Sequence, residues 1–136
     1  MSPDGAEDVT RIATAGDVVL ARQSARNLAL DCGLSLIDQT KLVTAVSELA
    51  RNTLIHGGGG TMRARTVREG MRRGVSAIFE DSGPGIPDLE LAMTDGWTSA
   101  SGLGLGLSGS RRLVDSFDID TAPGRGTSVA IVKWAR

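Results

Sequence analysis

A long helix that ends at four consecutive glycines is encoded by residues 35–60, SLIDQTKLVTAVSELARNTLIHGGGG. Ser35 is a typical N-cap with Asp38 three residues on, and the stretch up to His56 contains no glycine. Leucine, valine and alanine recur along it every three or four residues, which is typical of a helix with one apolar face. We therefore predict a helix from Ser35 to His56 that buries one face and is broken by residues 57–60.

The flanking segments predict strands and further helices by their hydrophobic periodicity and turn residues. Expected strands are Glu7–Ala13, Thr61–Val67, Gly74–Phe79, Phe117–Thr121 and Thr127–Trp134, and expected helices are Gly16–Cys32, Asp88–Met93 and Leu107–Asp115. Paired helices and hairpin strands favour helices over one face of a mixed, mainly antiparallel sheet. The predicted fold class is therefore α+β, a two-layer α/β sandwich, and not a doubly wound parallel sheet.

Length and composition predict one domain over residues 1–136, because 136 residues with 40% hydrophobic content suit a single core. Fifteen basic against sixteen acidic residues give a net charge of -1, so no overall field favours nucleic acid or an anionic membrane. No apolar run approaches the ~18 residues of a membrane span, so we expect a cytoplasmic protein. We expect neither nucleic acid nor a membrane as its partner.

Cys32 is the only cysteine and His56 the only histidine, which excludes an internal disulfide and a clustered Cys/His zinc site. Cys32 itself is expected to be a small buried side chain.

A polar row lies along the long helix, because Glu48, Asn52 and His56 follow one another at intervals of four residues. Glu48 and Asn52 can bring a carboxylate and an amide oxygen near a common point. That pair suits a general base beside a hard cation such as Mg²⁺. A solvated helix face fits the same spacing.

Asp81 follows an apolar strand and precedes Gly83 and Gly85 in the loop DSGPG. Its carboxylate could accept a hydrogen bond from an exocyclic amine while a flat ring lies against backbone that carries no side chains. An ordinary acidic surface turn explains this loop equally well.

Alternating glycines run from residue 101 to residue 109, SGLGLGLSG, into a predicted helix N-terminus, where free N–H groups favour phosphate. Residues 104–109 match the dinucleotide pattern G-x-G-x-x-G, but no strand precedes them, so a Rossmann site is not expected. A Walker phosphate loop and the motifs of eukaryotic protein kinases are absent.

The predicted hairpin after the four glycines is basic, since five arginines against one glutamate give +4 over residues 59–74. The arginines are Arg63, Arg65, Arg68, Arg72 and Arg73. The chain has two Phe, two Trp and no Tyr, so aromatic side chains for stacking bases are scarce. A surface for a partner protein and a solvated hairpin both fit this pattern.

Four motifs taken in order resemble the boxes of the GHKL ATPase/kinase superfamily, whose nucleotide site is the Bergerat fold. They are Glu48-Leu49-Ala50-Arg51-Asn52, Asp81-Ser82-Gly83-Pro84-Gly85, Gly102-Leu103-Gly104-Leu105-Gly106 and Gly124-Arg125-Gly126-Thr127. Within that superfamily the chain is similar to the anti-sigma-factor kinases of bacterial partner switching, including stressosome switch kinases. The resemblance covers nearly the whole chain.

The resemblance implies a role for each matching residue and implies ATP and Mg²⁺ as cofactors. Glu48 would activate a substrate hydroxyl, Asn52 would bind Mg²⁺, and Asp81 would accept the adenine amine. The expected nucleotide contacts around them are Gly83 and Gly85 at adenine, Gly102, Gly104 and Gly106 in a lid over the triphosphate, and Thr127 near the base. Some relatives carry an arginine just before the lid, where this chain has Ala100-Ser101, which leaves Arg111 and Arg112 as candidate cations at the γ-phosphate.

The function implied is that of an ATP/Mg²⁺-dependent serine/threonine protein kinase. It would phosphorylate a STAS-domain antagonist and bind or release a sigma factor or a phosphatase activator. The alternative is a non-catalytic anti-sigma or adaptor module that uses ATP only to order its lid. The sequence leaves open whether the chain forms a homodimer.

Overall fold

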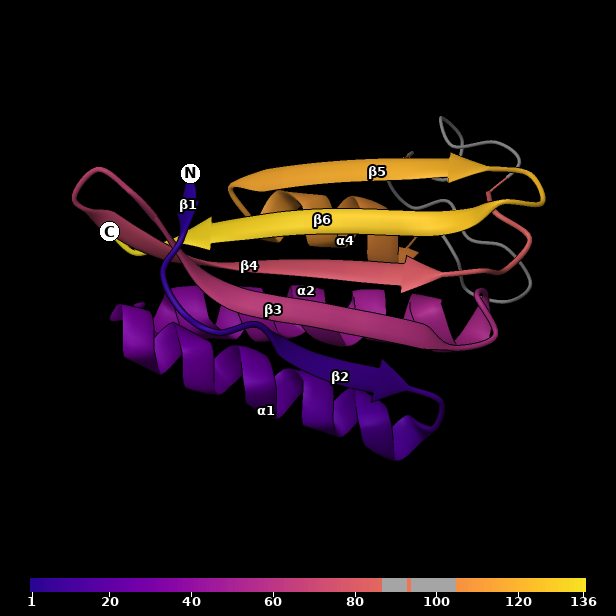
Figure 1. Cartoon of the computed structure of the whole chain (residues 1–136), viewed down its shortest axis with the longest axis horizontal. Coiled ribbons are helices and arrows are strands. Elements are labelled where there is room, and N and C mark those ends of the chain that lie inside the picture. The colour runs from indigo at the N-terminus through magenta and orange to yellow at the C-terminus, as the bar shows by residue number, and fades with distance from the viewer. Residues whose placement is uncertain (87–92, 94–104) are drawn as a thin grey trace.

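The fold is an α+β sandwich in a computed structural model that describes residues 1–86, 93 and 105–136 (Figure 1). Its elements in chain order are β1 Ser2–Pro3, β2 Asp8–Ile12, α1 Ala15–Cys32, α2 Leu36–Ile55, β3 Gly60–Glu69, β4 Arg72–Asp81, α4 Leu105–Leu113, β5 Ser116–Ala122 and β6 Gly126–Trp134. Among the described residues, no helix is both long and apolar enough to cross a membrane.

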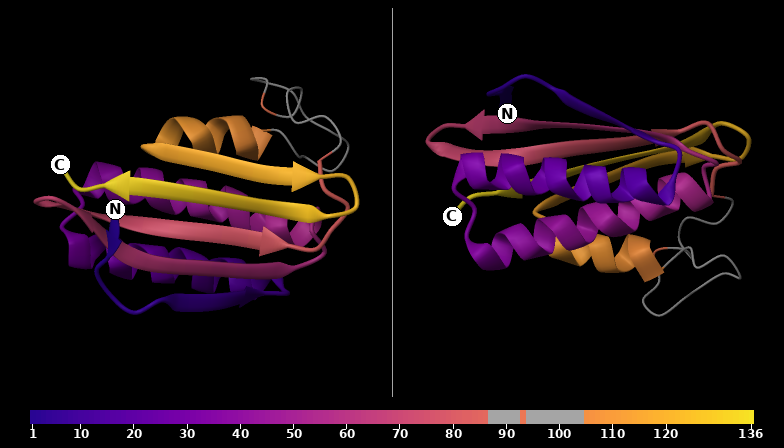
Figure 2. Two further views of the ribbon diagram at one scale, coloured as in Figure 1. Left: turned by 45° about the horizontal axis from the view of Figure 1, so that its top comes forward. Right: turned by 90° about the horizontal axis from the view of Figure 1, so that it is seen from below.

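The strands form one six-stranded sheet in the order β1-β3-β4-β6-β5, with β2 also paired to β3. Every pairing among the described strands is antiparallel, where a mixed sheet was predicted. The three described helices lie on one face of this sheet (Figure 2). The predicted two-layer α+β fold is therefore confirmed.

The two long helices form where they were predicted because local side chains satisfy their free ends. Thr14 and Asp17 make a capping box at the start of α1, and Ser35 accepts a 3.1 Å bond from the Asp38 N–H at the start of α2. The N–H groups of Ala13 and Thr14 bond the Asp17 carboxylate, and the bond from Ala13 is the main reason its pKa is lowered. Gly33 ends α1 at φ 77°.

The core lies between α2 and the sheet. Leu42, Val46 and Leu49 on the predicted apolar stripe of α2 are at most 1% exposed, and they belong to the same buried cluster as Met62 and Phe79. Burying each side chain of this size contributes about 1.5–3 kcal/mol. The stripe therefore fixes which side of α2 faces the sheet and which side remains for polar residues.

Some boundaries differ from the predicted ones. α4 begins and ends two residues earlier than predicted, since glycine is tolerated in the first turn, where N–H groups need no helical partner. β1 was not predicted, because a two-residue strand has no hydrophobic period. The predicted helix Asp88–Met93 lies outside the described residues, apart from Met93.

Cys32 is buried as predicted. Desolvation raises the pKa of its thiol, and the thiol donates a hydrogen bond to the Gly74 carbonyl at 3.1 Å.

Candidate nucleotide site

A pocket opens between α2 and the ends of β4 and β6. Its lining combines an apolar wall with a few polar groups. The lining residues are Leu49, Asn52, Thr53, His56, Phe79, Asp81, Gly85, Ile86, Leu107, Thr127 and Val129. Four predicted site residues, Asn52, Asp81, Gly85 and Thr127, are thus brought together by the fold.

Asp81 ends β4 and is held in a fixed position at the pocket. It lies opposite Gly60 on β3 and Thr127 on β6 in the sheet register. Its Oδ1 accepts a 2.9 Å hydrogen bond from the Gly83 N–H, so Gly83 shapes the turn although it does not line the pocket. Among the described residues, none bonds the second oxygen, Oδ2. The carboxylate can therefore accept a hydrogen bond from a ligand.

Gly57 makes room for this carboxylate. A Cβ at position 57 would lie 2.4 Å from both Cβ and Cγ of Asp81, far inside van der Waals contact. The sequence indicates only a helix break at this glycine, because the contact joins residues 24 positions apart in the chain. Gly57 is therefore a site residue that the sequence alone does not reveal.

Substituting Gly57 by alanine tests this packing. We expect Gly57→Ala to push Asp81 out of place and to weaken ATP binding at least tenfold, measured by calorimetry, while the chain still folds. Gly109→Ala is the matched control, because a Cβ at 109 meets nothing within 4 Å and alanine favours the helix. Equal ATP affinity in Gly57→Ala and wild type would show that the position of Asp81 does not govern binding.

A threonine pair supports the loop after Asp81. The Oγ1 atoms of Thr121 and Thr127 are 2.8 Å apart, and Thr121 Oγ1 accepts a 3.0 Å bond from the Ile86 N–H. Gly85, at φ 78°, packs so closely on β5 that a Cβ there would lie 2.1 Å from the Ala122 carbonyl oxygen. Thr121 is a supporting residue that none of the sequence motifs indicates. Pairing the strands across the turn at residues 124–126 would have placed it opposite Thr127.

The polar row on α2 is only partly directed at the pocket. Asn52 and His56 line it, whereas Glu48 is half-buried one turn earlier and is not among the lining residues that the structure describes. The Asn52 Nδ2 atom is buried and has no hydrogen-bond partner among the described residues. A buried amide without a partner is costly, so this side chain is suited to meeting a ligand.

These groups fit ATP with Mg²⁺. Asp81 offers an acceptor, Phe79 and Ile86 offer apolar surface for a flat ring, and Asn52 offers an amide. Within the described part of the chain no cluster of three or more His, Cys, Asp or Glu could hold a metal ion. Mg²⁺ takes oxygen ligands and in nucleotide sites is usually held by one or two carboxylates plus substrate phosphates and waters. In this pocket the amide oxygen of Asn52 would take the place of a carboxylate oxygen.

The predicted lid is described only at its end. Gly102 and Gly104 lie outside the described residues, and Gly106 lies in the first turn of α4 and not in a loop before the helix, which corrects the predicted boundary. Its N–H is then one of the free donors of a helix N-terminus, so a phosphate contact remains compatible with this position. Arg111 and Arg112 are exposed in the last turn of α4 and do not line the pocket.

Comparisons with known proteins agree with this geometry. The family model described as "Histidine kinase-, DNA gyrase B-, and HSP90-like ATPase" matches residues 37–135. The chain is 42% identical over 130 residues to the serine/threonine-protein kinase RsbT of Bacillus subtilis (strain 168), covering 96% of this chain and 98% of that protein. It is 32% identical over 101 residues to an anti-sigma F factor of Clostridium novyi (strain NT), covering 69% of each.

Two solved structures share the fold. The RsbU and RsbW domains of a Mycobacterium tuberculosis protein superpose with a TM-score of 0.64 at 21% identity, covering 97% of this chain and 33% of that one. The mycobacterial sensor histidine kinase MprB superposes with a TM-score of 0.57 at 19% identity, covering 96% of this chain and 99% of that one. Identities this low support the architecture only.

Proposed function

The chain belongs to the histidine kinase-, DNA gyrase B- and HSP90-like ATPase family as a serine/threonine-protein kinase similar to RsbT, and from this premise we propose that it uses ATP and Mg²⁺ to phosphorylate a serine or threonine of a STAS-domain protein. The observation that carries the proposal is the pocket in which Asp81 is anchored through Gly83 and packed against Gly57. An anchored acceptor beside an apolar wall suits the amine edge of adenine.

The residues of the pocket would divide the work between binding and chemistry. Asp81 accepts the adenine amine, and the bare backbone at Gly85 lets the ring approach the loop that Thr121 and Thr127 hold. Asn52 would hold Mg²⁺, which when bound neutralises charge on the phosphates. Phosphoryl transfer needs positioning, a cation and a base more than it needs covalent chemistry.

Glu48 is the proposed general base. It lies one helical turn from Asn52 on the same face of α2 and remains partly accessible, so a hydroxyl of a protein substrate can reach it. It would take the hydroxyl proton as the oxygen attacks the γ-phosphorus and the bond from that phosphorus to the β,γ-bridging oxygen breaks. This leaves Glu48 neutral, the substrate phosphorylated and ADP as the leaving group. Because Glu48 lies outside the pocket lining, it would contact the protein substrate and would not contact the adenine.

The proposed output is a partner switch. The similarity to an anti-sigma F factor supports a second binding partner, either a sigma factor or a phosphatase activator, that is bound or released as the STAS-domain protein is phosphorylated. The observation that Glu48 does not line the pocket favours one alternative, a non-catalytic adaptor that binds ATP without transferring phosphate.

Incubation with γ-labelled ATP, Mg²⁺ and a STAS-domain protein encoded in the same genome separates the two functions. We expect label on a serine or threonine of the STAS-domain protein, located by mass spectrometry, and none when Mg²⁺ is removed with EDTA. The kinase proposal would be wrong if several such proteins stay unlabelled while ATP still changes how the chain binds them. That result would support the adaptor.

A further inference from the structure

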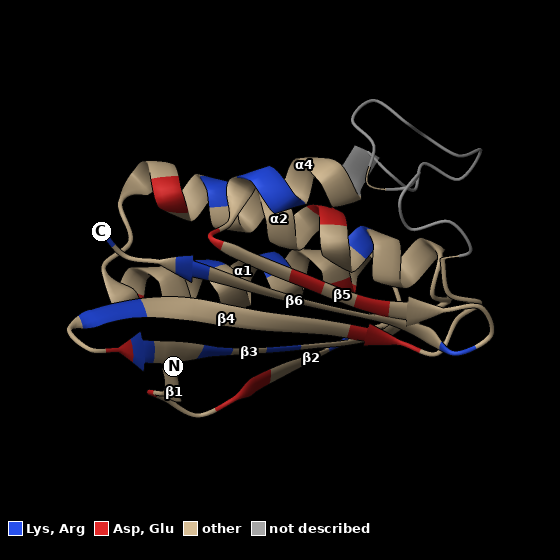
Figure 3. Ribbon diagram, turned by 90° about the horizontal axis from the view of Figure 1, so that it is seen from above, with Lys and Arg blue, Asp and Glu red and all other residues tan. Residues whose placement is uncertain are grey.

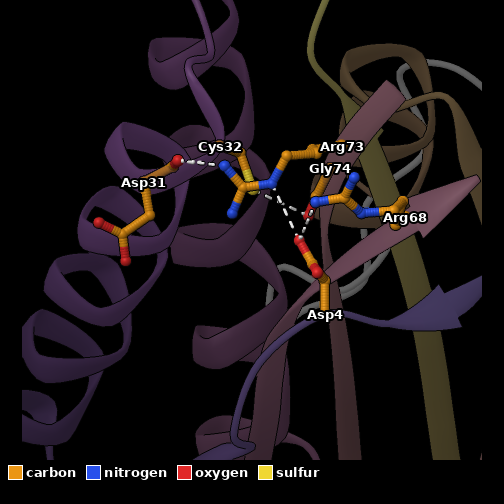
Figure 4. A network of polar contacts seen from close by, with 6 residues as sticks. All are labelled: Asp4, Asp31, Cys32, Arg68, Arg73 and Gly74. Atoms are coloured by element: carbon orange, nitrogen blue, oxygen red, sulfur yellow. Dashed lines mark hydrogen bonds and ion pairs between the residues drawn. The ribbon is translucent and has the colours of Figure 1, made fainter. Parts of the chain in front are cut away.

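The N-terminal segment, which we define as residues 1–7, pairs with arginines of the basic hairpin. Asp4 pairs with Arg73 Nε at 2.9 Å and with Arg68 Nη2 at 3.4 Å (Figure 4). Arg73 also donates a 2.8 Å bond to the Asp31 carbonyl at the end of α1. Two of the five arginines thus bind a single carboxylate.

Two further arginines along β3 contact the same segment. Arg65 Nη2 donates to the Gly5 carbonyl at 2.9 Å, and Arg63 Nη1 pairs with Glu7 at 3.5 Å. Arginines, drawn blue, mark β3 beside the acidic residues, drawn red, that lead into β2 (Figure 3). We call Arg63, Arg65, Arg68 and Arg73 the arginine edge.

Backbone pairing places the N-terminal segment against β3 as an additional strand. Ser2 and Pro3 pair with Arg68 and Val67, and the Asp4 N–H donates to the Thr66 carbonyl at 2.9 Å. The segment therefore combines strand hydrogen bonds with carboxylates three residues apart, at Asp4 and Glu7. A short acidic strand is the chemistry that the arginine edge fits.

No apolar side chain anchors this segment. Every residue from 1 to 7 is exposed except Asp4, which is half-buried, and the buried core begins at Ile12. Ion pairs this exposed contribute little stability each. A competing strand that supplies the same groups could therefore replace the segment without disturbing the core.

Acidification does not release the segment near neutral pH. The hydrogen bonds from Arg73 first, and then from Arg68, lower the pKa of Asp4 below its ordinary value of 3.8. A lowered folded pKa means that this stabilisation is present above 3.8 and is lost only as the pH falls through the lower, folded value. The Asp4 carboxylate therefore stays ionised and paired at physiological pH.

We propose that the arginine edge is a docking site for a short, extended acidic segment of a partner protein, which pairs with β3 in place of residues 1–7. Pairing with β3 requires peptide N–H and C=O groups, so a peptide fits this site better than a nucleic acid does. The segment seated there in this chain shows the expected pattern, with two carboxylates three residues apart.

The test uses the full-length chain and a fluorescent peptide that copies residues 1–8, MSPDGAED. The double variant Asp4→Ala, Glu7→Ala keeps all four arginines but loosens its own segment. We expect it to bind the peptide about tenfold more tightly than wild type does, by fluorescence anisotropy, and to lose that affinity as salt is raised. A peptide with asparagine and glutamine in place of its Asp4 and Glu7 should bind to neither protein.

Adding Arg65→Gln or Arg68→Gln to the double variant should abolish the gain. These arginines are chosen because Arg73 also bonds the end of α1, and thermal unfolding checks that each variant is folded. Equal binding of the peptide to wild type and the double variant, or binding that survives loss of the arginines, would overturn the proposal. Wild-type dimers that light scattering detects and that the double variant no longer forms would instead assign the edge to a second copy.

Discussion

Replacing Asp81 by asparagine is expected to weaken ATP binding by about 10² or more, beyond detection in ordinary calorimetry. The amide nitrogen would face the adenine amine with a second donor, and each unpaired group costs ~1–3 kcal/mol. The asparagine oxygen can still accept the 2.9 Å bond from the Gly83 N–H, so the turn should stay intact. The loss would therefore report on the ligand contact and not on the fold.

Glu80→Gln is the matched control for this variant. Glu80 is the preceding residue of the same strand, is exposed, and pairs with Arg63 at 3.3 Å instead of lining the pocket. Its substitution should leave the ATP affinity within twofold of wild type. Unchanged affinity in a folded Asp81→Asn chain would remove Asp81 from the adenine role and with it the main support for a nucleotide site.

Glu48→Gln should separate binding from chemistry. Glutamine keeps the shape and helix propensity of glutamate but cannot take a proton, so phosphotransfer should fall by ~10² to 10⁴. ATP affinity should not change, because Glu48 does not line the pocket. Single-turnover assays with the labelled STAS-domain protein measure the first quantity and calorimetry the second.

A Glu48→Gln chain that phosphorylates its substrate at the wild-type rate would contradict the general-base role. Parallel loss of ATP affinity would show instead that Glu48 belongs to the nucleotide site. The two outcomes point to different errors, so the variant tests the base assignment separately from the location of the pocket.

Local features of the sequence predicted most of the architecture. Ser35 and Gly33 mark helix ends, and the apolar stripe of α2 sets its buried face; each of these signals acts over a few residues. The same holds for Asp81, whose place at the end of a strand is fixed by the neighbouring apolar run. Such features can be predicted because their physical causes lie within one or two turns of chain.

Contacts between distant residues could not be predicted in this way. The contact of Gly57 with Asp81 and the bonds of Arg65 and Arg73 to the N-terminal segment join residues 24 to 69 positions apart. The basic hairpin therefore predicted a partner surface or a solvated hairpin, and its pattern did not indicate that all five arginines have partners within the chain. The position of Glu48 could not be predicted either. Its spacing of four residues from Asn52 places both on one face of α2 but does not determine which of the two side chains lines the pocket.

Titration of the ¹⁵N-labelled chain with ATP and Mg²⁺, followed by amide chemical shifts, tests the nucleotide site most directly. We predict that the largest shifts fall on Gly83, Gly85 and Thr127, while Gly33 and Met71 at the opposite end of the fold stay unchanged. No shifts at saturating ATP, or shifts centred on Gly33 and Met71, would contradict the assignment of the pocket beside Asp81 as the nucleotide site.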